Sequence, residues 1–100
     1  MNYYYIYILK CSDRTFYTGV TNNLDRRFVQ HQQGLDVNSY THKRRPVELV
    51  YSEEFGDIKE AISREKQIKG WSKKKKEALI NSKHDELVRR SKRARKQKFY

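Results

Sequence analysis

The segment Tyr3–Leu9 constrains the fold of this chain more than any other. It is an unbroken run of tyrosine, isoleucine and leucine, and aromatic and β-branched side chains favour a β-strand. Side chains of a strand point alternately to its two faces. One face would carry Tyr3, Tyr5, Tyr7 and Leu9, and the other Tyr4, Ile6 and Ile8. Because neither face is polar, we expect a strand that is covered on both sides.

A second strand and a helix are predicted directly after this segment. Cys11–Arg14 is a polar turn and Thr15–Val20 resumes the strand pattern, so the two strands should form a hairpin. A helix should follow, because Asn22 or Asn23 is a good N-cap. Gly34 is a natural residue just beyond its end.

The rest of the folded part predicts one more strand and two helices. Pro46 and Gly70 separate these elements. The expected elements are a loop at 35–45, a strand at Val47–Tyr51, a helix from Asp57 to about Lys69 and a last helix from Ser72 to about Asn81. The predicted order is therefore strand, strand, helix, strand, helix, helix.

Size and composition exclude several classes of protein. A chain of 100 residues makes one domain with one modest core. Its longest apolar run is far shorter than the roughly 20 residues of a membrane span, and the first residues lack the pattern of a signal peptide. The single cysteine, Cys11, excludes an internal disulfide and any multi-cysteine zinc site. We therefore expect a cytoplasmic protein.

The charge of the chain predicts a polyanionic partner. The formal net charge is +11, and residues 89–100 contain basic side chains and no acidic one. A second basic cluster lies within residues 64–76. Basic groups that neutralise phosphates release counterions, which favours binding to nucleic acid. We divide the chain into a folded domain, residues 1–83, and a basic tail, residues 84–100. The alternative interpretation of the tail is a solvated extension without a partner.

Glu65 interrupts the apolar stripe of the helix predicted after Asp57. The residues that this helix should bury are Ile58, Ala61, Ile62 and Ile68. Glu65 falls on the same stripe by its three- and four-residue spacing. A buried carboxylate carries a desolvation cost unless it is paired or bound to a metal. Two interpretations follow: a salt bridge with Arg64, Lys66 or a nearby arginine, or a ligand for a hard divalent cation, which prefers oxygen donors.

Arg27 and His31 are four residues apart and therefore share one face of the predicted first helix. Cleavage of a phosphodiester needs positive charge for the phosphate and a base for the attacking water. A guanidinium, an imidazole, the placed carboxylate and nearby tyrosines together supply such groups. A solvated pair without a function is the alternative. A tyrosine can act as the base only if its pKa falls well below its ordinary value of about 10.

Five short motifs, taken in order along the chain, resemble those of the GIY-YIG nuclease superfamily. They are Tyr5-Ile6-Tyr7, Tyr17-Thr18-Gly19, a helix start at Asn23–Arg27, a glutamate helix at Ala61–Glu65, and the late Asn81. The first two are ten residues apart and resemble the paired motif that names the family. The resemblance covers the chain up to the basic tail. It is strongest to small stand-alone bacterial proteins that resemble the catalytic domain of the excision-repair nuclease.

The resemblance implies an α+β fold, in which a small three-stranded antiparallel sheet is flanked by helices. It also implies hydrolysis of DNA phosphodiester bonds assisted by one divalent cation, Mg²⁺ or Mn²⁺. By resemblance, Tyr7 or Tyr17 would activate or orient the attacking water, Arg27 would stabilise charge on the scissile phosphate, His31 would act beside the attacking or leaving group, Glu65 would be the metal ligand, and Asn81 would be a supporting polar residue. A protein partner is expected to supply target specificity.

Three positions depart from the family pattern. Tyr5 replaces the glycine of the first name motif, and Thr18 replaces the isoleucine of the second. Val20 stands where some members have a lysine near the second tyrosine. That lysine would be one means of lowering a tyrosine pKa, so the choice between Tyr7 and Tyr17 as the base stays open.

We therefore predict a divalent-metal-dependent DNA endonuclease that selects DNA structures and serves DNA repair or recombination. The side chains expected to contact the nucleic acid are Lys69, Lys73, Lys74, Lys75, Lys76, Arg89, Arg90, Lys92 and Arg93. The main alternative is a non-catalytic DNA- or RNA-binding protein with the same fold, including an RNA- or ribosome-associated one. A protein-interaction module with a tyrosine-rich surface is a further alternative.

Overall fold

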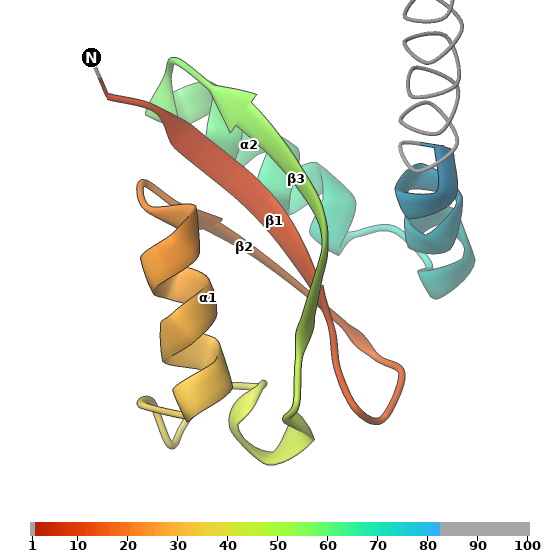
Figure 1. Cartoon of the computed structure of the whole chain (residues 1–100). Coiled ribbons are helices and arrows are strands. Elements are labelled where there is room, and N and C mark those ends of the chain that lie inside the picture. Colours follow the sequence, from red (N-terminus) through yellow and green to blue (C-terminus); the bar gives the residue numbers. More distant parts are fainter. Residues whose placement is uncertain (1, 83–100) are drawn as a thin grey trace, which may run out of the picture.

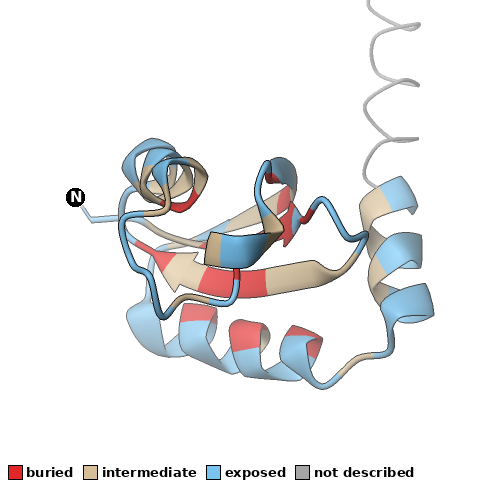
Figure 2. Ribbon diagram, turned by 90° about the horizontal axis from the view of Figure 1, so that it is seen from below, coloured by how far each residue is buried: buried red, intermediate tan, exposed pale blue. Residues whose placement is uncertain are grey.

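The computed structural model describes residues 2–82 and has the predicted α+β fold (Figure 1). Its three-stranded antiparallel sheet has the order β2-β1-β3. The elements are β1 (Tyr4–Lys10), β2 (Phe16–Thr21), α1 (Leu24–Gln33), the 3₁₀ helix η1 (His42–Arg44), β3 (Glu48–Phe55), α2 (Ile58–Lys69) and a last helix that covers residues 73–82 of the described chain. Figure 2 shows α1 on one face of the sheet and α2 on the other.

The central strand β1 is buried on both faces, as its composition predicts. Residues 6–9 are each at most 1% exposed. Ile6 and Ile8 belong to the hydrophobic core under α2. Tyr7 and Leu9 belong to a second, smaller core under α1. The alternation of one strand therefore supplies two different layers of the molecule.

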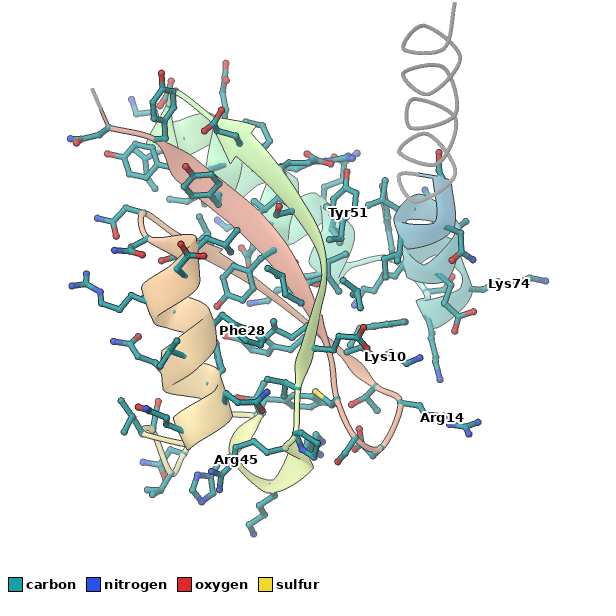
Figure 3. All side chains as sticks on the ribbon, in the orientation of Figure 1. Lys10, Arg14, Phe28, Arg45, Tyr51 and Lys74 are labelled. Atoms are coloured by element: carbon teal, nitrogen blue, oxygen red, sulfur yellow. The ribbon has the colours of Figure 1, made fainter. Side chains whose placement is uncertain are left out.

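The helix α1 begins and ends where its capping residues predict. The Asn23 side chain accepts a hydrogen bond from the backbone N–H of Arg26 at 3.0 Å. Gly34 follows the helix with φ +66°, a left-handed conformation that glycine adopts without a steric cost. Phe28 points from α1 toward the sheet (Figure 3) and packs against the smaller core that contains Tyr7. These contacts fix the face of α1 that meets the sheet.

The helix α2 buries a narrower stripe than the sequence predicts. Asp57 caps it as expected, accepting a hydrogen bond from the Lys59 N–H at 2.9 Å. Its buried residues are Ala61, Glu65 and Ile68. The prediction that Ile58 and Ile62 are buried is wrong, since they are 38% and 37% exposed. Ile62 lies about 100° around the helix from buried Ala61 and therefore points away from the centre of the buried stripe.

Two segments after α1 differ from their prediction. The loop at 35–45 contains the helical turn η1. The strand β3 continues to Phe55 instead of ending at Tyr51, because Phe55 still pairs with Tyr4 of β1. Pairing with the central strand extends β3 beyond the apolar segment that the sequence marks.

The last helix begins as predicted. Ser72 Oγ accepts a hydrogen bond from the Lys75 N–H at 3.2 Å, which is the geometry of an N-cap. Its half-buried residues Leu79 and Ile80 pack against the core under α2. Within residues 2–82, every helix is too short or too polar to cross a membrane.

Candidate active site

A hydrogen bond joins Tyr7 of β1 to His31 of α1. The Tyr7 hydroxyl lies 2.9 Å from His31 Nε2, and both residues are buried. Gly19 of β2 pairs with Tyr7 across the sheet, and a Cβ at this position would collide with the Tyr7 hydroxyl. The glycine of the second name motif therefore gives the tyrosine of the first the room to reach His31.

The protonation states of this pair follow from their surroundings. Burial, with a smaller contribution from the charge of Arg27, lowers the pKa of His31 below its ordinary 6.5. Burial raises the pKa of Tyr7 above 10, and Tyr17 adds to this effect while Arg27 opposes it. Near neutral pH, His31 is thus an uncharged imidazole and Tyr7 an intact phenol. The alternative interpretation assumed a solvated pair of Arg27 and His31, and His31 is instead buried and hydrogen-bonded.

Tyr17 of β2 completes an aromatic cluster around the pair. Its ring centroid lies 6.2 Å from that of Tyr7 and 5.1 Å from that of His31. On its other side, the Tyr40 ring stacks at 6.1 Å with an interplanar angle of 22°. The Arg44 guanidinium lies 3.9 Å from the Tyr40 ring centroid and also pairs with Asp13 of the hairpin turn at 3.0 Å.

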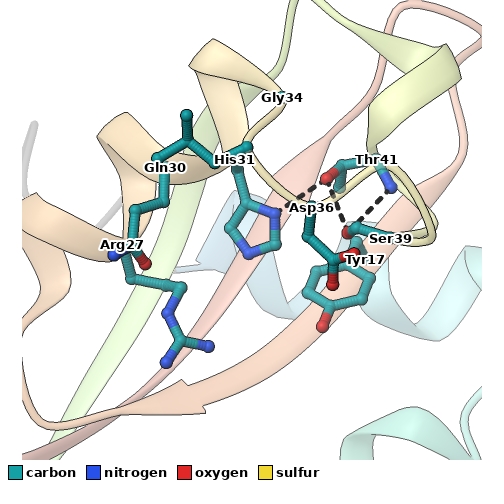
Figure 4. Close-up of a pocket in the computed structure, with 9 residues that line it drawn as sticks. Tyr17, Arg27, Gln30, His31, Gly34, Asp36, Ser39 and Thr41 are labelled. Atoms are coloured by element: carbon teal, nitrogen blue, oxygen red, sulfur yellow. Dashed lines mark hydrogen bonds between the residues drawn. The ribbon is translucent and has the colours of Figure 1, made fainter.

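A pocket of about 310 Å³ opens over this cluster (Figure 4). Tyr17, Arg27 and His31 line one part of it, and Ser39 and Thr41 line another. Buried Tyr7 is not among the lining residues. An anionic ligand in this pocket would meet a guanidinium, a phenol and an imidazole, and also the carboxylate of Asp36.

Glu65 is buried as predicted, but its partner is different. The Lys69 ammonium lies 2.6 Å from Glu65 Oε1, one helical turn further along α2. Arg64, one of the expected partners, instead binds Glu53 of β3 at 3.0 Å. The hydrogen bond from Lys69 to Glu65 is the main cause that raises the pKa of Lys69, and burial opposes it.

The residues present suit a hydrated divalent cation. Among residues 2–82, no three His, Cys, Asp or Glu side chains gather into a group that could hold a metal. Mg²⁺ needs no such group, because it binds through one or two carboxylates and keeps several waters. Glu65 can supply one carboxylate, while its Oε1 is paired with Lys69. The donor set fits Mg²⁺ or Mn²⁺ held mostly by water and substrate oxygens.

Other predicted site residues lie apart from the cluster. Asn81 lines a different pocket, of about 570 Å³, together with Lys10, Arg14 and Lys73. Figure 3 shows Lys74 pointing away from the sheet on the last helix. The exposed or half-buried Lys73, Lys74, Lys75 and Lys76 share this helix. The predicted contacts Arg89, Arg90, Lys92 and Arg93 lie outside the described residues.

The structure adds two residues that no sequence pattern singled out. Thr41 is 1% exposed, and its Oγ1 lies 2.7 Å from His31 Nδ1. Tyr40 stacks on Tyr17. Both belong to the segment predicted as a plain loop, where neither periodicity nor a motif gives a signal.

Comparisons with known proteins identify the family of this chain. The family model of the GIY-YIG catalytic domain matches residues 3–78. A UPF0213 protein of Clostridium perfringens is 49% identical over 79 residues, which cover 79% of this chain and 84% of that protein. A UPF0213 protein of Natronomonas pharaonis is 46% identical over 77 residues, which cover 77% of this chain and 89% of that protein.

Two solution NMR structures share the fold. A UPF0213 protein from Bacillus halodurans has a TM-score of 0.54 and 40% identity, covering 81% of this chain and 85% of its own. A protein from E. faecalis has a TM-score of 0.59 and 33% identity, and the match covers 84% of this chain and 88% of that protein. Fold, motif order and sequence identity agree, and the chain belongs to the GIY-YIG catalytic domain family, whose domain is typical of endonucleases.

Proposed function

We propose that this protein is a DNA endonuclease that hydrolyses phosphodiester bonds with the help of one divalent cation. The observation that carries the proposal is the hydrogen bond between buried Tyr7 and uncharged His31, with Arg27 beside it in an open pocket. A structural tyrosine–histidine pair needs neither a guanidinium nor a pocket. Attack on a phosphodiester uses all of these groups.

The two tyrosines divide the work according to their exposure. Tyr17 lines the pocket and is therefore the one that can touch an attacking water. Tyr17 can take the proton of that water while its own hydroxyl proton passes to buried Tyr7, whose proton passes in turn to His31 Nε2. Arg27 donates hydrogen bonds only, and in the pocket it would stabilise the charge that develops on the phosphate.

Glu65 would hold the cation. A bound Mg²⁺ or Mn²⁺ would supply Lewis-acid polarisation of the phosphate. Lys69 keeps the buried carboxylate paired, at 2.6 Å. The Lys69 ammonium, whose side chain is more than half exposed, would also contact a phosphate of the DNA.

Further DNA contacts are proposed on the last helix and on the basic tail. The side chains concerned are Lys73, Lys74, Lys75, Lys76, Arg89, Arg90, Lys92 and Arg93. They would attract the phosphate backbone without reading sequence. Selection of a DNA structure, a protein partner for target choice and a role in DNA repair or recombination are parts of the same proposal.

The decisive experiment compares Glu65→Ala with a matched control, Glu60→Ala, which lies in the exposed first turn of the same helix. Labelled duplex, single-stranded, nicked, flapped and branched DNAs are incubated with Mg²⁺, Mn²⁺ or EDTA. We expect cleavage that needs the metal, persists in the control and is lost in Glu65→Ala, with DNA binding largely retained. Metal-dependent cleavage by Glu65→Ala at the wild-type rate would contradict the assignment of the metal ligand.

A non-catalytic nucleic-acid-binding protein is the second candidate. The observation that favours it is the Glu65–Lys69 ion pair, in which an ammonium already neutralises the carboxylate. This candidate predicts binding to DNA or RNA without cleavage under every metal condition of the same experiment.

A further inference from the structure

We propose that Thr41 is a positioning residue, which holds His31 with its proton on Nδ1 so that Nε2 stays free to accept the proton of Tyr7. The catalytic benefit of this arrangement rests on the proposed nuclease function. The arrangement itself is a property of the folded protein and can be tested without cleavage.

Thr41 is buried, although it belongs to the segment that the sequence predicts as a loop. Its side chain is 1% exposed, and its Oγ1 lies 2.7 Å from His31 Nδ1. The same Oγ1 lies 3.1 Å from Ser39 Oγ, which also accepts a hydrogen bond from the Thr41 N–H at 3.4 Å. Figure 4 shows these contacts as a chain from His31 through Thr41 to Ser39. With Tyr7 on Nε2, both nitrogens of the imidazole have a protein partner.

The direction of the hydrogen bonds is assigned from what each group can donate. The Arg27 guanidinium beside the Tyr7 hydroxyl can only donate, whereas the neighbouring Tyr17 hydroxyl can donate or accept. The Tyr7 hydroxyl lies 2.9 Å from His31 Nε2, and we assign it as the donor to that nitrogen. A neutral imidazole that accepts at Nε2 carries its proton on Nδ1. That proton points at Thr41 Oγ1, and the Thr41 hydroxyl proton is then left for Ser39 Oγ.

The backbone around Thr41 is held from two directions. Within the segment, the His42 N–H donates to the Ser39 carbonyl at 3.1 Å and the Arg44 N–H to the Thr41 carbonyl at 3.0 Å. From outside, the Arg44 side chain binds Asp13 of the hairpin turn at 3.0 Å. Thr41 thus presents a fixed acceptor to His31, as carboxylates and backbone carbonyls do for other functional histidines.

The charged and titratable groups around His31 come from four segments. They are Tyr7 of β1, Tyr17 of β2, Arg27 of α1 and Asp36 of the following loop. None of these faces Nδ1 through a hydrogen bond within residues 2–82, where Thr41 is the partner of that nitrogen. The hydroxyl of Thr41 is therefore the group whose removal should change the tautomer.

Long-range ¹H–¹⁵N NMR spectra of the imidazole test this directly, because they distinguish a protonated nitrogen from a bare one. In the wild-type protein, we expect His31 to be protonated on Nδ1. In Thr41→Val, which keeps the shape and removes the hydroxyl, an Nδ1–H would be buried without a partner, so the proton should move to Nε2. Thr41→Ser should restore the wild-type spectrum.

Thr18→Val is the matched control. Thr18 is another buried threonine, 2% exposed, and its Oγ1 has no hydrogen-bond partner within the described part of the chain. This substitution should leave the His31 tautomer unchanged. A wild-type His31 protonated on Nε2 would overturn the inference without any variant, and an unchanged tautomer in folded Thr41→Val would do the same.

Cleavage assays on the same proteins separate this inference from the proposed function. With an active wild type, Thr41→Val should cleave about 10- to 100-fold more slowly, and Thr41→Ser should recover most of the rate. If the wild type cuts no DNA but the tautomer moves as expected, the nuclease proposal fails and the role of Thr41 in fixing His31 stands. Full activity of Thr41→Val with a displaced tautomer would overturn its role in catalysis.

Discussion

The central strand β1 contributes different kinds of side chain to the two faces of the sheet. On the α2 face, Ile6 and Ile8 pack into an apolar core with Ala61 and Ile68. On the α1 face, the next residue along the strand, Tyr7, ends in a hydroxyl bonded to a buried histidine. The α2 face gains its stability from apolar area removed from water, whereas the α1 face carries polar groups that must be paired.

Glu65 is the exception that refines this comparison. It is a charged residue on the otherwise apolar face of α2, where it is only 8% exposed. Its partner is Lys69 of the same helix rather than a residue of the sheet. A carboxylate at the edge of an apolar layer has a desolvation cost, which the ion pair with Lys69 offsets.

Ile68→Ala should cause the largest loss of stability, because it opens a cavity on the apolar face. We expect about 2–5 kcal/mol of unfolding free energy to be lost, measured by urea denaturation. Ile62→Ala, at a 37% exposed position of the same helix, should cost much less. The rate per folded molecule should not change in either variant. Equal losses from the two variants would contradict the division between buried and exposed positions.

Tyr7→Phe should affect chemistry more than folding. It removes the hydroxyl that faces His31 Nε2 and keeps the ring in the smaller core. We expect DNA cleavage to fall by about 100-fold, the size of a general acid–base contribution. Tyr5→Phe, which loses an exposed hydrogen bond to Glu54, is the control and should cleave normally. Wild-type cleavage by Tyr7→Phe would remove Tyr7 from the mechanism.

Arg27→Gln should raise the pKa of His31, which lies on the α1 face of the sheet. Burial and Arg27 hold the folded-state pKa of His31 below the unfolded value, so the folded protein binds fewer protons in that range. The contribution of His31 to stability is therefore complete above its ordinary pKa of 6.5 and is lost as the pH falls through the folded-state pKa. NMR titration of His31 in Arg27→Gln should give a higher pKa, still below 6.5, since burial remains the main cause. An unchanged titration would show that Arg27 does not act on His31.

Asn23→Ala should have the smallest effect. It removes the N-cap of α1, and the unfolding free energy should fall by about 1 kcal/mol in denaturant titrations. Asp57→Ala, which removes the cap of α2, provides the same change on the other face. If α1 and α2 only cover the two faces of the sheet, both variants should cleave at the wild-type rate per folded molecule. A specific loss of activity in Asn23→Ala would show that the start of α1 also shapes the pocket.

The sequence predicted more of the fold than of the contacts inside the site. Caps and alternation located the strands, α1 and α2, because these signals are local. The burial of Ile62 was predicted wrongly, since spacing alone does not tell how wide a stripe of the helix the sheet covers. The pairing of Lys69 with Glu65 was not predicted, because a choice among several nearby basic side chains depends on the surroundings of α2.

The order of amino acids was enough to place Tyr3–Leu9 in a central strand, one carboxylate on an apolar stripe, and Arg27 and His31 on one helix face. These are consequences of the two- and 3.6-residue periods of the backbone. The folded structure was needed to show that Tyr7 meets His31 over Gly19 and that Thr41 meets the other side of the same imidazole. Hydrogen bonds between residues far apart in the chain depend on how the layers pack, and no local period encodes that packing.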